Sequence, residues 1–376
     1  MPRGEKIIVG LSGGVDSAVA ALLLLRAGAR VEALHMSNWD DDSGYCSAAQ
    51  DLRDAREVCR ELGIPLHRVN FSTAYRERVF AEFLAEYRAG RTPNPDVLCN
   101  REIKFDLFLE HARRLGADAI ATGHYARAGG RTGLRMARDP DKDQTYFLHA
   151  VPRAALSACR FPIGGLRKPE VRDLATAAGL PVHEKRDSTG LCFIGERPFR
   201  EFLGHYLDEA PGPMETPEGE LVGRHSGLMF YTIGQRRGLG IGGRAGRSGA
   251  WYVAAKEPAR NRLIVVQDRQ HPLLWSRWLD ASEPAWIAGE PRALSAGELH
   301  CVARIRHRQP PQPCVVRPSS SGGLTVRFDA PQWAIAPGQY VVFYAGDDCL
   351  GGARIARRLP GAAAGPATEQ AAAALG

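Results

Sequence analysis

Short apolar runs alternate with amphipathic helices over the first half of this chain. Residues 6–11 form an apolar run rich in β-branched side chains, and after a Gly-Gly pair residues 18–26 favour a helix that ends before Gly28. The same reasoning predicts further strands at 30–36, 65–71 and 119–122 and a helix at 47–62. Strands that alternate with helices of ten or more residues indicate an α/β fold with a doubly wound parallel sheet.

Two amphipathic stripes lie between the third and fourth predicted strands. Apolar side chains repeat at i, i+3, i+4 and i+7 in Phe80, Phe83, Leu84 and Tyr87, and again in Phe105, Phe108, Leu109 and Ala112. This spacing predicts two helices that pack against the core.

The link between these helices, residues 90–101, has a different character. It carries Pro93 and Pro95, so we expect neither helix nor central strand there. A long irregular loop in a regular α/β frame is usually part of a site. This loop brings Asp96 and Cys99 close together in the sequence.

The second half of the chain is rich in short β-runs, glycine and proline. We expect a catalytic domain at 1–207 that ends in a helix at 198–207. A small linking domain at 208–275, a β-barrel-like domain at 276–359 and a disordered tail at 360–376 would follow. A G-x-G-x-x-G match begins at Gly238, but it follows Arg236 and Arg237 rather than a strand, so it predicts a flexible loop and no dinucleotide site.

Composition predicts a soluble protein with a polyanionic partner. No apolar run approaches the length of a membrane span, and the first residues lead directly into a strand, so we expect a cytoplasmic protein that contacts no membrane. The net charge is +7, and only six of the 49 basic residues are lysines. Arginine suits bidentate phosphate recognition, although a genome-wide bias toward arginine codons would give the same count.

Eight cysteines are spread along the chain without any C-x-x-C pair, which argues against structural zinc. Most of them should be buried thiols in a reducing compartment. Cys192 differs because it follows Lys185, Arg186 and a turn, surroundings that favour a thiolate. A buried structural cysteine is the alternative at this position.

The turn after the first strand has the chemistry of a phosphate site. Its two glycines let backbone amides and a helix N-terminus point at one spot, and Ser12 and Ser17 add hydroxyl groups. Asp16 suits a magnesium ion held against the phosphates. The run Ser12–Ser17 resembles the S-G-G-x-D-S loop of the N-type ATP pyrophosphatases, which cleave ATP between the α and β phosphates. No G-K-S or G-K-T occurs, which disfavours transfer of the γ-phosphate.

Three arginines alternate near the end of the chain. Arg304, Arg306 and Arg308 would share one face of a predicted strand, where like charges repel unless an anion or open water faces them. A phosphate backbone is one such partner, and a solvated edge strand is the alternative.

As an ordered set, these motifs closely resemble the bacterial tRNA-specific 2-thiouridylases. The likeness extends to about Leu359, through S-G-G-V-D-S, G-R-T-P-N-P-D-x-L-C-N, A-T-G-H-Y, K-D-Q, D-S-T-G-x-C-F-I-G, G-Q-R-x-G-L-G-I-G-G and P-G-Q. The resemblance implies ATP-dependent replacement of O2 by sulfur at the wobble uridine of tRNA. It implies that ATP binds at Gly10, Leu11, Ser12, Gly13, Gly14, Val15, Asp16, Ser17, Met36 and Gly123, with magnesium expected at Asp16 alone.

The resemblance also implies roles for the two cysteine segments. Cys192 would carry a persulfide. A sulfur-relay protein would deliver its outer sulfur, which that protein receives from a cysteine desulfurase. Cys99 would be the nucleophile, which either frees sulfide or closes a transient Cys99–Cys192 disulfide. Asp96 would handle the proton as acid or base.

Contacts with tRNA are implied in the same way. Asn94, Pro95 and Asp96 would hold the flipped base. Further tRNA contacts are implied at Lys142, Asp143, Gln144, Arg306 and His307. The family has tyrosine after the arginine where this chain has His307, and an imidazole can also stack on a base. We expect a monomer whose Cys99 loop moves when tRNA binds.

Two other readings remain open on the residues alone. The same loop serves NAD and GMP synthetases, which activate a carboxyl or carbonyl group and then admit ammonia, and these enzymes need no cysteine pair. The chain could instead be an RNA-binding factor whose ATP site is only a sensor. Neither reading explains two cysteine segments.

Overall fold

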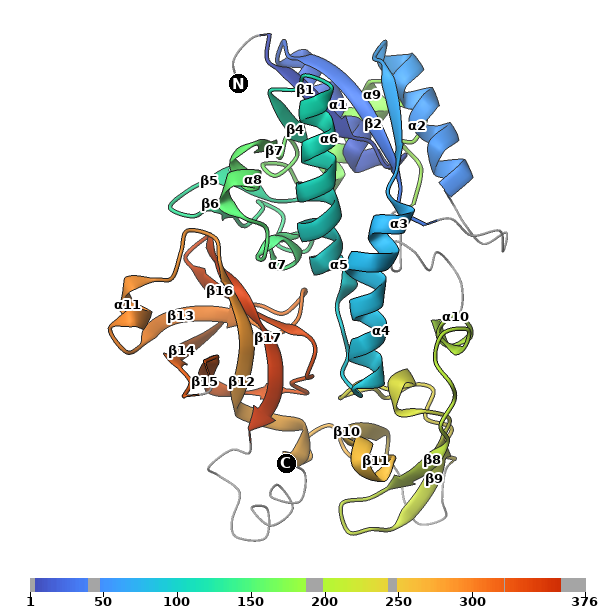
Figure 1. Ribbon diagram of the computed structural model, residues 1–376, viewed down its shortest axis with the longest axis vertical. Helices are drawn as coiled ribbons and strands as arrows, with labels where there is room; N and C mark the ends of the chain where they lie inside the picture. Colours follow the sequence, from blue (N-terminus) through green and yellow to red (C-terminus); the bar gives the residue numbers. More distant parts are fainter. Residues whose placement is uncertain (1–3, 40–47, 187–198, 243–248, 321, 360–376) are drawn as a thin grey trace.

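The structure, a computed structural model, describes residues 4–39, 48–186, 199–242, 249–320 and 322–359. Three β-sheets organise these residues, and Figure 1 shows the parallel sheet at one end and the two other sheets at the opposite end. Within the described residues, no helix is both long enough and apolar enough to cross a membrane. The predicted tail at 360–376 lies outside the described residues.

The first sheet has five parallel strands in the order β3-β2-β1-β4-β7. Their bounds are β1 Lys6–Gly10, β2 Arg30–Ser37, β3 Leu66–Asn70, β4 Ala119–Ala121 and β7 Cys159–Arg160. The predicted doubly wound parallel sheet is confirmed. Because β1 is central and the strand order reverses beside it, ligands are expected at its carboxyl end.

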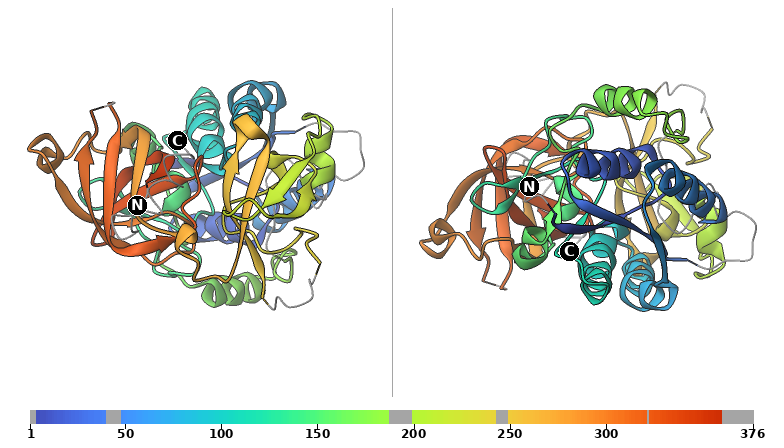
Figure 2. Two further views of the ribbon diagram at one scale, coloured as in Figure 1. Left: turned by 90° about the horizontal axis from the view of Figure 1, so that it is seen from below. Right: turned by 90° about the horizontal axis from the view of Figure 1, so that it is seen from above.

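Helices cover both faces of this sheet (Figure 2). The helices α1 (Val15–Arg26), α2 (Ala48–Leu62) and α9 (Lys168–Ala177) bury one face, where Ile7 and Val9 of β1 point. On the other face, Ile8 packs with Phe108 of α6 (Phe108–Arg114). This alternation along β1 is what a strand buried on both sides requires.

Both amphipathic stripes are buried, as predicted. The first lies on a helical run made of α3 (Ser72–Tyr75), η1 (Arg76–Phe80) and α4 (Ala81–Arg88). The second lies on α5 (Pro95–Leu98), η2 (Cys99–Leu107) and α6. The expectation that residues 90–101 contain no helix is therefore wrong, because Pro95 occupies the first turn of α5, where a missing N–H costs nothing.

The second sheet has four strands in the order β10-β11-β8-β9, and the third is a barrel closed by pairing of β12 with β17. The strands of the second sheet are β8 Gly212–Glu215, β9 Leu221–His225, β10 Trp251–Glu257 and β11 Arg262–Gln267. Those of the barrel are β12 Trp275–Trp286, β13 Leu299–Arg304, β14 Gln312–Pro318, β15 Leu324–Trp333, β16 Tyr340–Ala345 and β17 Asp348–Leu359. The predicted barrel is thus confirmed, while the domain limits stay predictions.

One hairpin from the first half joins the barrel sheet, which the sequence did not predict. It consists of β5 (Arg127–Gly129) and β6 (Gly133–Arg135), and Arg135 pairs with Asp348 of β17. The remaining helices are α7 Thr145–Leu148, α8 Arg153–Ser157, α10 Phe199–Gly204, α11 Arg292–Ser295, η3 Leu228–Phe230, η4 Pro258–Arg260 and η5 Pro272–Leu274.

His149 lies in the interior between α7 and the barrel. Its ring centroid is 4.9 Å from that of Tyr340, and its Nδ1 lies 2.7 Å from the carbonyl oxygen of Tyr146. Burial lowers the pKa of His149 to about 4. An unfolded His149 takes up its proton near pH 6.5, so the unfolded state binds more protons between pH 6.5 and 4.

We therefore expect the free energy of unfolding to fall as the pH falls through this window. The titration of His149 accounts for a loss of about 3 kcal/mol over the whole window. Urea unfolding of wild type and His149→Asn at pH 7, 5.5 and 4.5 measures this contribution, because other titrating groups cancel in the difference. Parallel pH profiles for the two proteins would contradict the expectation.

Candidate active site

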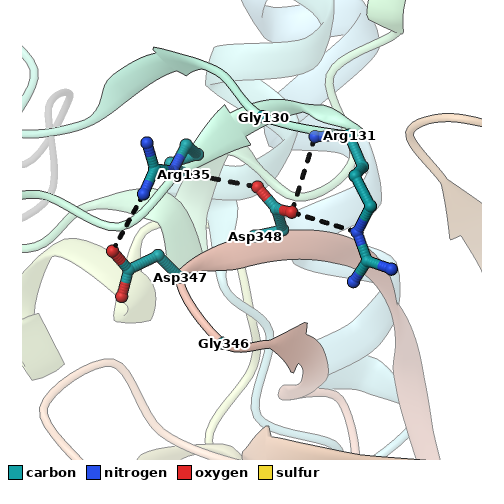
Figure 3. Close-up of a pocket in the computed structure, with 6 residues that line it drawn as sticks. All are labelled: Gly130, Arg131, Arg135, Gly346, Asp347 and Asp348. Carbon is teal, nitrogen blue, oxygen red and sulfur yellow. Dashed lines mark hydrogen bonds and ion pairs between the residues drawn. The ribbon is translucent and has the colours of Figure 1, made fainter.

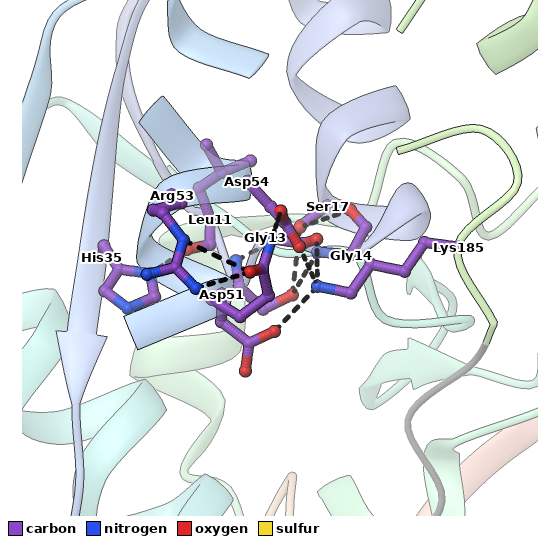
Figure 4. Close-up of polar contacts among 11 residues, drawn as sticks. Leu11, Gly13, Gly14, Ser17, His35, Asp51, Arg53, Asp54 and Lys185 are labelled. Atoms are coloured by element: carbon purple, nitrogen blue, oxygen red, sulfur yellow. Dashed lines mark hydrogen bonds and ion pairs between the residues drawn. The ribbon is translucent and has the colours of Figure 1, made fainter. Parts of the chain in front are cut away.

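The run Ser12–Ser17, predicted to bind phosphate and called the phosphate loop below, lies at the carboxyl end of β1 and leads into α1 (Figure 4). Ser17 holds the loop together, since its Oγ accepts from the Ser12 amide at 3.2 Å and donates to the Gly14 carbonyl at 3.1 Å. The two hydroxyl oxygens of Ser12 and Ser17 are 3.1 Å apart. A loop tied in this way presents amides and a helix N-terminus toward one spot, which suits an anion.

The residues predicted to bind ATP from other strands lie beside this loop. A Cβ added to Gly123, just beyond β4, would lie 2.6 Å from the Ser17 nitrogen. One added to Gly10 would lie 3.5 Å from Cε of Met36, which is on β2. The structure therefore brings Gly10, Met36, Gly123 and the loop together at one sheet edge.

The close approach of Gly123 to the loop makes a sharp prediction. In Gly123→Ala the new Cβ would clash with the backbone at Ser17, so the loop would have to move. We expect ATP binding to weaken by about tenfold or more and the free energy of unfolding to fall by about 1–3 kcal/mol. Calorimetric titration with ATP and thermal unfolding measure the two effects. Gly165→Ala is the matched control, because a Cβ there meets nothing within 4 Å; equal losses in both variants would count against the contact.

Asp16 is engaged by two groups that sequence reasoning missed. Lys168 Nζ donates to both carboxylate oxygens at 2.8 and 2.9 Å, and the Tyr125 hydroxyl donates to Oδ1 at 2.9 Å. Gln144 Oε1 in turn accepts from the Tyr125 amide at 2.9 Å. Lys168 is the first residue of α9, and the helix dipole disfavours a cation at a helix N-terminus. This unfavourable position is the sequence signal that Lys168 needs an anionic partner.

Magnesium at Asp16 stays a prediction. Within the described residues, no group of three or more His, Cys, Asp or Glu side chains is arranged to hold a metal ion. Both Asp16 oxygens already accept from Lys168, so an ion there would require Lys168 to move. The donor set in this conformation thus does not fit a protein-bound magnesium ion.

Cys99 and Asp96 lie on neighbouring turns of one helical run, and Cys99 is fully buried. Burial raises the pKa of the Asp96 carboxyl, and the charge of Lys104 opposes that rise. Burial also holds the pKa of His124 well below its usual value, helped by Lys104. The site thus pairs a thiol with a carboxyl group that keeps its proton to higher pH than usual.

The segment before Cys99 is fastened to the barrel. Gln339 Nε2 donates to the carbonyl oxygens of Thr92 and Pro93 at 2.8 and 3.2 Å, and the Thr92 amide donates to the Pro337 carbonyl at 2.9 Å. Residues 337–339 are the P-G-Q motif. This motif therefore anchors the strand-like lead into α5, which carries Asn94, Pro95 and Asp96.

Cys192 lies outside the described residues, so its predicted persulfide and its pairing with Cys99 stay predictions. The predicted turn at Cys192 lies outside them as well. Lys185, just before this segment, is described, and its ammonium group contacts the phosphate loop.

The predicted tRNA contacts are placed with different accessibility. Asp143 is buried, where its carboxylate accepts from the Ala137 amide, Thr145 and Arg304. His307 is half-buried, lies 2.8 Å from the Asp143 carbonyl and packs on Phe147. Lys142 is also partly buried. Their contacts with tRNA stay predictions.

The three arginines do not share a strand face as predicted. β13 ends at Arg304, whose guanidinium group is buried against Asp143 at 2.6 Å. Arg306 donates to the carbonyl oxygens of Ile233 and Ala334 instead. The anion that faces Arg304 is thus a carboxylate of the protein, which the sequence could not show because it lies 161 positions away.

A separate hollow opens on the surface where the β5–β6 hairpin meets the turn before β17 (Figure 3). Its lining is charged, but Arg131 is 3.3 Å from Asp348 and Arg135 is 3.2 Å from Asp347. None of the predicted site residues lines it. These ion pairs fasten the hairpin to the barrel, and the hollow gives no reason to move the candidate site.

Family models match most of the chain. The model described as the tRNA methyl transferase HUP domain matches residues 5–196, the tRNA methyl transferase PRC-barrel domain matches 200–267, and the aminomethyltransferase beta-barrel domain matches 276–355. These three stretches correspond to the parallel sheet, the four-stranded sheet and the barrel.

Curated relatives carry a different name from the family models. The chain is 56% identical to the tRNA-specific 2-thiouridylase of Alkalilimnicola ehrlichii, covering 96% of this chain and all of that protein. It is 55% identical to the proteins of the same name in Chromohalobacter salexigens, over 92% of this chain and 91% of that one, and Pseudomonas aeruginosa, over 93% and 94%. Because these similarities span nearly the full length, the chain belongs to the tRNA-specific 2-thiouridylase family.

Proposed function

We propose that this protein is an ATP-dependent tRNA sulfurtransferase that forms 2-thiouridine at the wobble position, number 34, of tRNA. The observation that carries the proposal is the phosphate loop at the carboxyl end of β1, with Met36 and Gly123 beside it. Within the same fold, a buried cysteine and a carboxyl group of raised pKa lie near each other on one helical run. An activating site and a thiol are the two parts that exchange of oxygen for sulfur requires.

ATP activates the uridine in the first step. O2 of the uridine attacks the α-phosphate, pyrophosphate leaves, and C2 becomes electrophilic because its oxygen is now bound to AMP, a good leaving group. The loop amides and the N-terminus of α1 stabilise the phosphate charge. Lys168 and Tyr125 orient Asp16 beside the loop.

Sulfur enters in the second step. In the direct route the terminal sulfur of a persulfide on Cys192 attacks C2 and AMP departs, which leaves C2 joined to Cys192 through a disulfide. The Cys99 thiolate then attacks Cys192 Sγ and releases 2-thiouridine. In the other route the Cys99 thiolate attacks Cys192 Sγ first, and the sulfide released attacks C2 and displaces AMP. Both routes form a Cys99–Cys192 disulfide that an external thiol must reduce. Asp96, whose pKa is raised, acts as the general acid or base beside the target uridine.

The partners proposed here are those that the family resemblance implies. Asn94, Pro95 and Asp96 hold the flipped uridine, while Lys142, Asp143, Gln144, Arg306 and His307 form or support the surface for tRNA. A sulfur-relay protein fed by a cysteine desulfurase loads Cys192. We place the protein in the cytoplasm as a monomer, with magnesium accompanying ATP.

The nucleotide products separate this proposal from its rivals. We expect AMP and pyrophosphate to form, and no ADP, when the protein is given ATP, unmodified tRNA and a persulfide sulfur donor. Chromatography of the nucleotides with and without tRNA measures this. An RNA-binding factor that only senses ATP would form neither product, and an ammonia-dependent synthetase would form AMP without tRNA once its own acceptor and ammonia are supplied.

A further inference from the structure

Lys185 is the one lysine whose ammonium group bridges the phosphate loop and α2 among the described residues (Figure 4). Its Nζ donates to the Gly13 carbonyl at 3.0 Å, to Asp51 Oδ1 at 2.8 Å and to Asp54. All three partners are local to the loop or to the first turns of the adjacent helix. Such a group influences the loop without standing in the phosphate site itself.

The contact with Gly13 decides which way one loop amide points. The peptide bond between Gly13 and Gly14 is trans, so its carbonyl and its N–H point in opposite directions. Because Lys185 binds the carbonyl from outside, the Gly14 N–H is turned into the loop, where it lies 3.4 Å from the Ser12 hydroxyl. An inward N–H is a donor for a phosphate oxygen.

Lys185 also balances charge at the edge of the site. Asp51 and Asp54 place two carboxylates next to the loop, and Gly13 approaches so closely that a Cβ there would lie 2.3 Å from the Asp51 carbonyl. Burial alone would lower the pKa of Lys185, but its bonds to Asp51 and Asp54 outweigh that effect and raise the pKa. The ammonium group therefore stays charged and offsets the repulsion that these carboxylates would exert on ATP.

The backbone of Lys185 is held as firmly as its side chain. Arg172 of α9 donates to the carbonyl oxygens of His183 and Lys185 at 3.0 and 3.2 Å. The Lys185 amide donates to the Val182 carbonyl at 3.0 Å. Because both the backbone and the ammonium group of Lys185 are held by hydrogen bonds, this residue links α9, α2 and the loop.

We propose that Lys185 is a positioning residue for ATP, which orients the Gly13–Gly14 peptide and neutralises Asp51 and Asp54 beside the phosphate site. This inference rests on the proposed use of ATP and names a residue outside the phosphate loop that makes the loop competent. It acts through the loop and does not touch the reacting atoms.

Calorimetric titration with ATP in the absence of tRNA tests the role. We expect Lys185→Met to weaken ATP binding by about tenfold or more, since hydrogen bonds to a charged group are lost. In turnover, the KM for ATP should rise while kcat at saturating ATP changes little. Glu184→Gln is the matched control, because that neighbouring side chain is 89% exposed, and it should bind ATP like wild type.

A second pair of variants separates the two parts of the role. Asp51→Asn/Asp54→Asn removes the charges that Lys185 balances, and adding Lys185→Met to it then removes only the Gly13 contact. We expect the triple variant to bind ATP about threefold to tenfold more weakly than the double variant. This comparison also serves if Lys185→Met alone leaves two unbalanced carboxylates and fails to fold.

Equal affinities in both comparisons would overturn the proposal, as would a fall in kcat with the KM for ATP unchanged. Equal affinity of the triple and double variants alone would overturn the orienting role of the Gly13 contact. Because binding is measured without tRNA, the outcome does not depend on sulfur transfer. If wild type binds ATP but forms no 2-thiouridine, the proposed function fails. The ATP affinities of the Lys185 variants still test the positioning role of Lys185 in that case.

Discussion

Cys99→Ser is expected to reduce formation of 2-thiouridine by about a thousandfold or more, because a hydroxyl group at this position can neither open a persulfide nor form a disulfide. Activation of the uridine does not use this thiol, so release of pyrophosphate should persist. The substitution exchanges one small buried side chain for another of nearly the same shape. The protein should therefore remain folded.

The measurement compares nucleotides and nucleosides in the same reaction. Cys159→Ser is the control, since Cys159 is also buried but lies on β7 and contacts the backbone of Arg160. It should retain thiolation. Full thiolation by Cys99→Ser would remove Cys99 from the mechanism, and loss of pyrophosphate release together with thiolation would indicate that Cys99 acts before the sulfur step.

Asp143→Asn is expected to destabilise the fold by about 3–5 kcal/mol, which is the second large effect. Arg304 and Asp143 have only 6% and 1% of their side chains exposed, and their ion pair joins the barrel to the segment before α7. Removing the carboxylate charge would leave the guanidinium group buried without a counterion. A buried charge without a counterion lowers the free energy of unfolding by far more than an exposed ion pair raises it.

Urea unfolding measures this difference, with two further variants as references. Asp143→Asn/Arg304→Met should recover much of the lost stability, because the unbalanced charge is gone. Glu110→Gln, in a pair with Arg114 that is largely exposed, should change stability by less than about 1 kcal/mol. A similar small change for Asp143→Asn would contradict the structural role assigned to this pair.

Local patterns predicted the parts of the fold that depend on near neighbours. The period of Phe80, Phe83, Leu84 and Tyr87 identified a buried helical face, because helix geometry alone decides which side chains share a side. The strand, turn and helix predicted around Ser12–Ser17 are confirmed because they too depend on near neighbours, while phosphate binding there stays a prediction.

The wrong predictions have two physical causes. Pro93 and Pro95 predict the absence of a helix, but proline fits the first turn of a helix, and the flanking sequence does not reveal where the helix begins. The alternating pattern predicts a solvated or RNA-facing strand for Arg304, because its partner Asp143 is distant in the chain. Lys168 and Lys185 were missed as site residues because their partners, too, are known only from the fold.

Nucleoside analysis of tRNA tests the central claim most directly. Purified protein, ATP, magnesium and a sulfur-relay protein that carries a persulfide are incubated with unmodified tRNA, which is then digested and analysed by mass spectrometry. We predict 2-thiouridine at the wobble position with wild type, none without ATP, and almost none with Cys99→Ser. AMP formation with no sulfur in the RNA would contradict the assignment to tRNA thiolation. AMP that forms only after ammonia and a carboxyl or carbonyl acceptor are supplied would favour an ammonia-dependent synthetase.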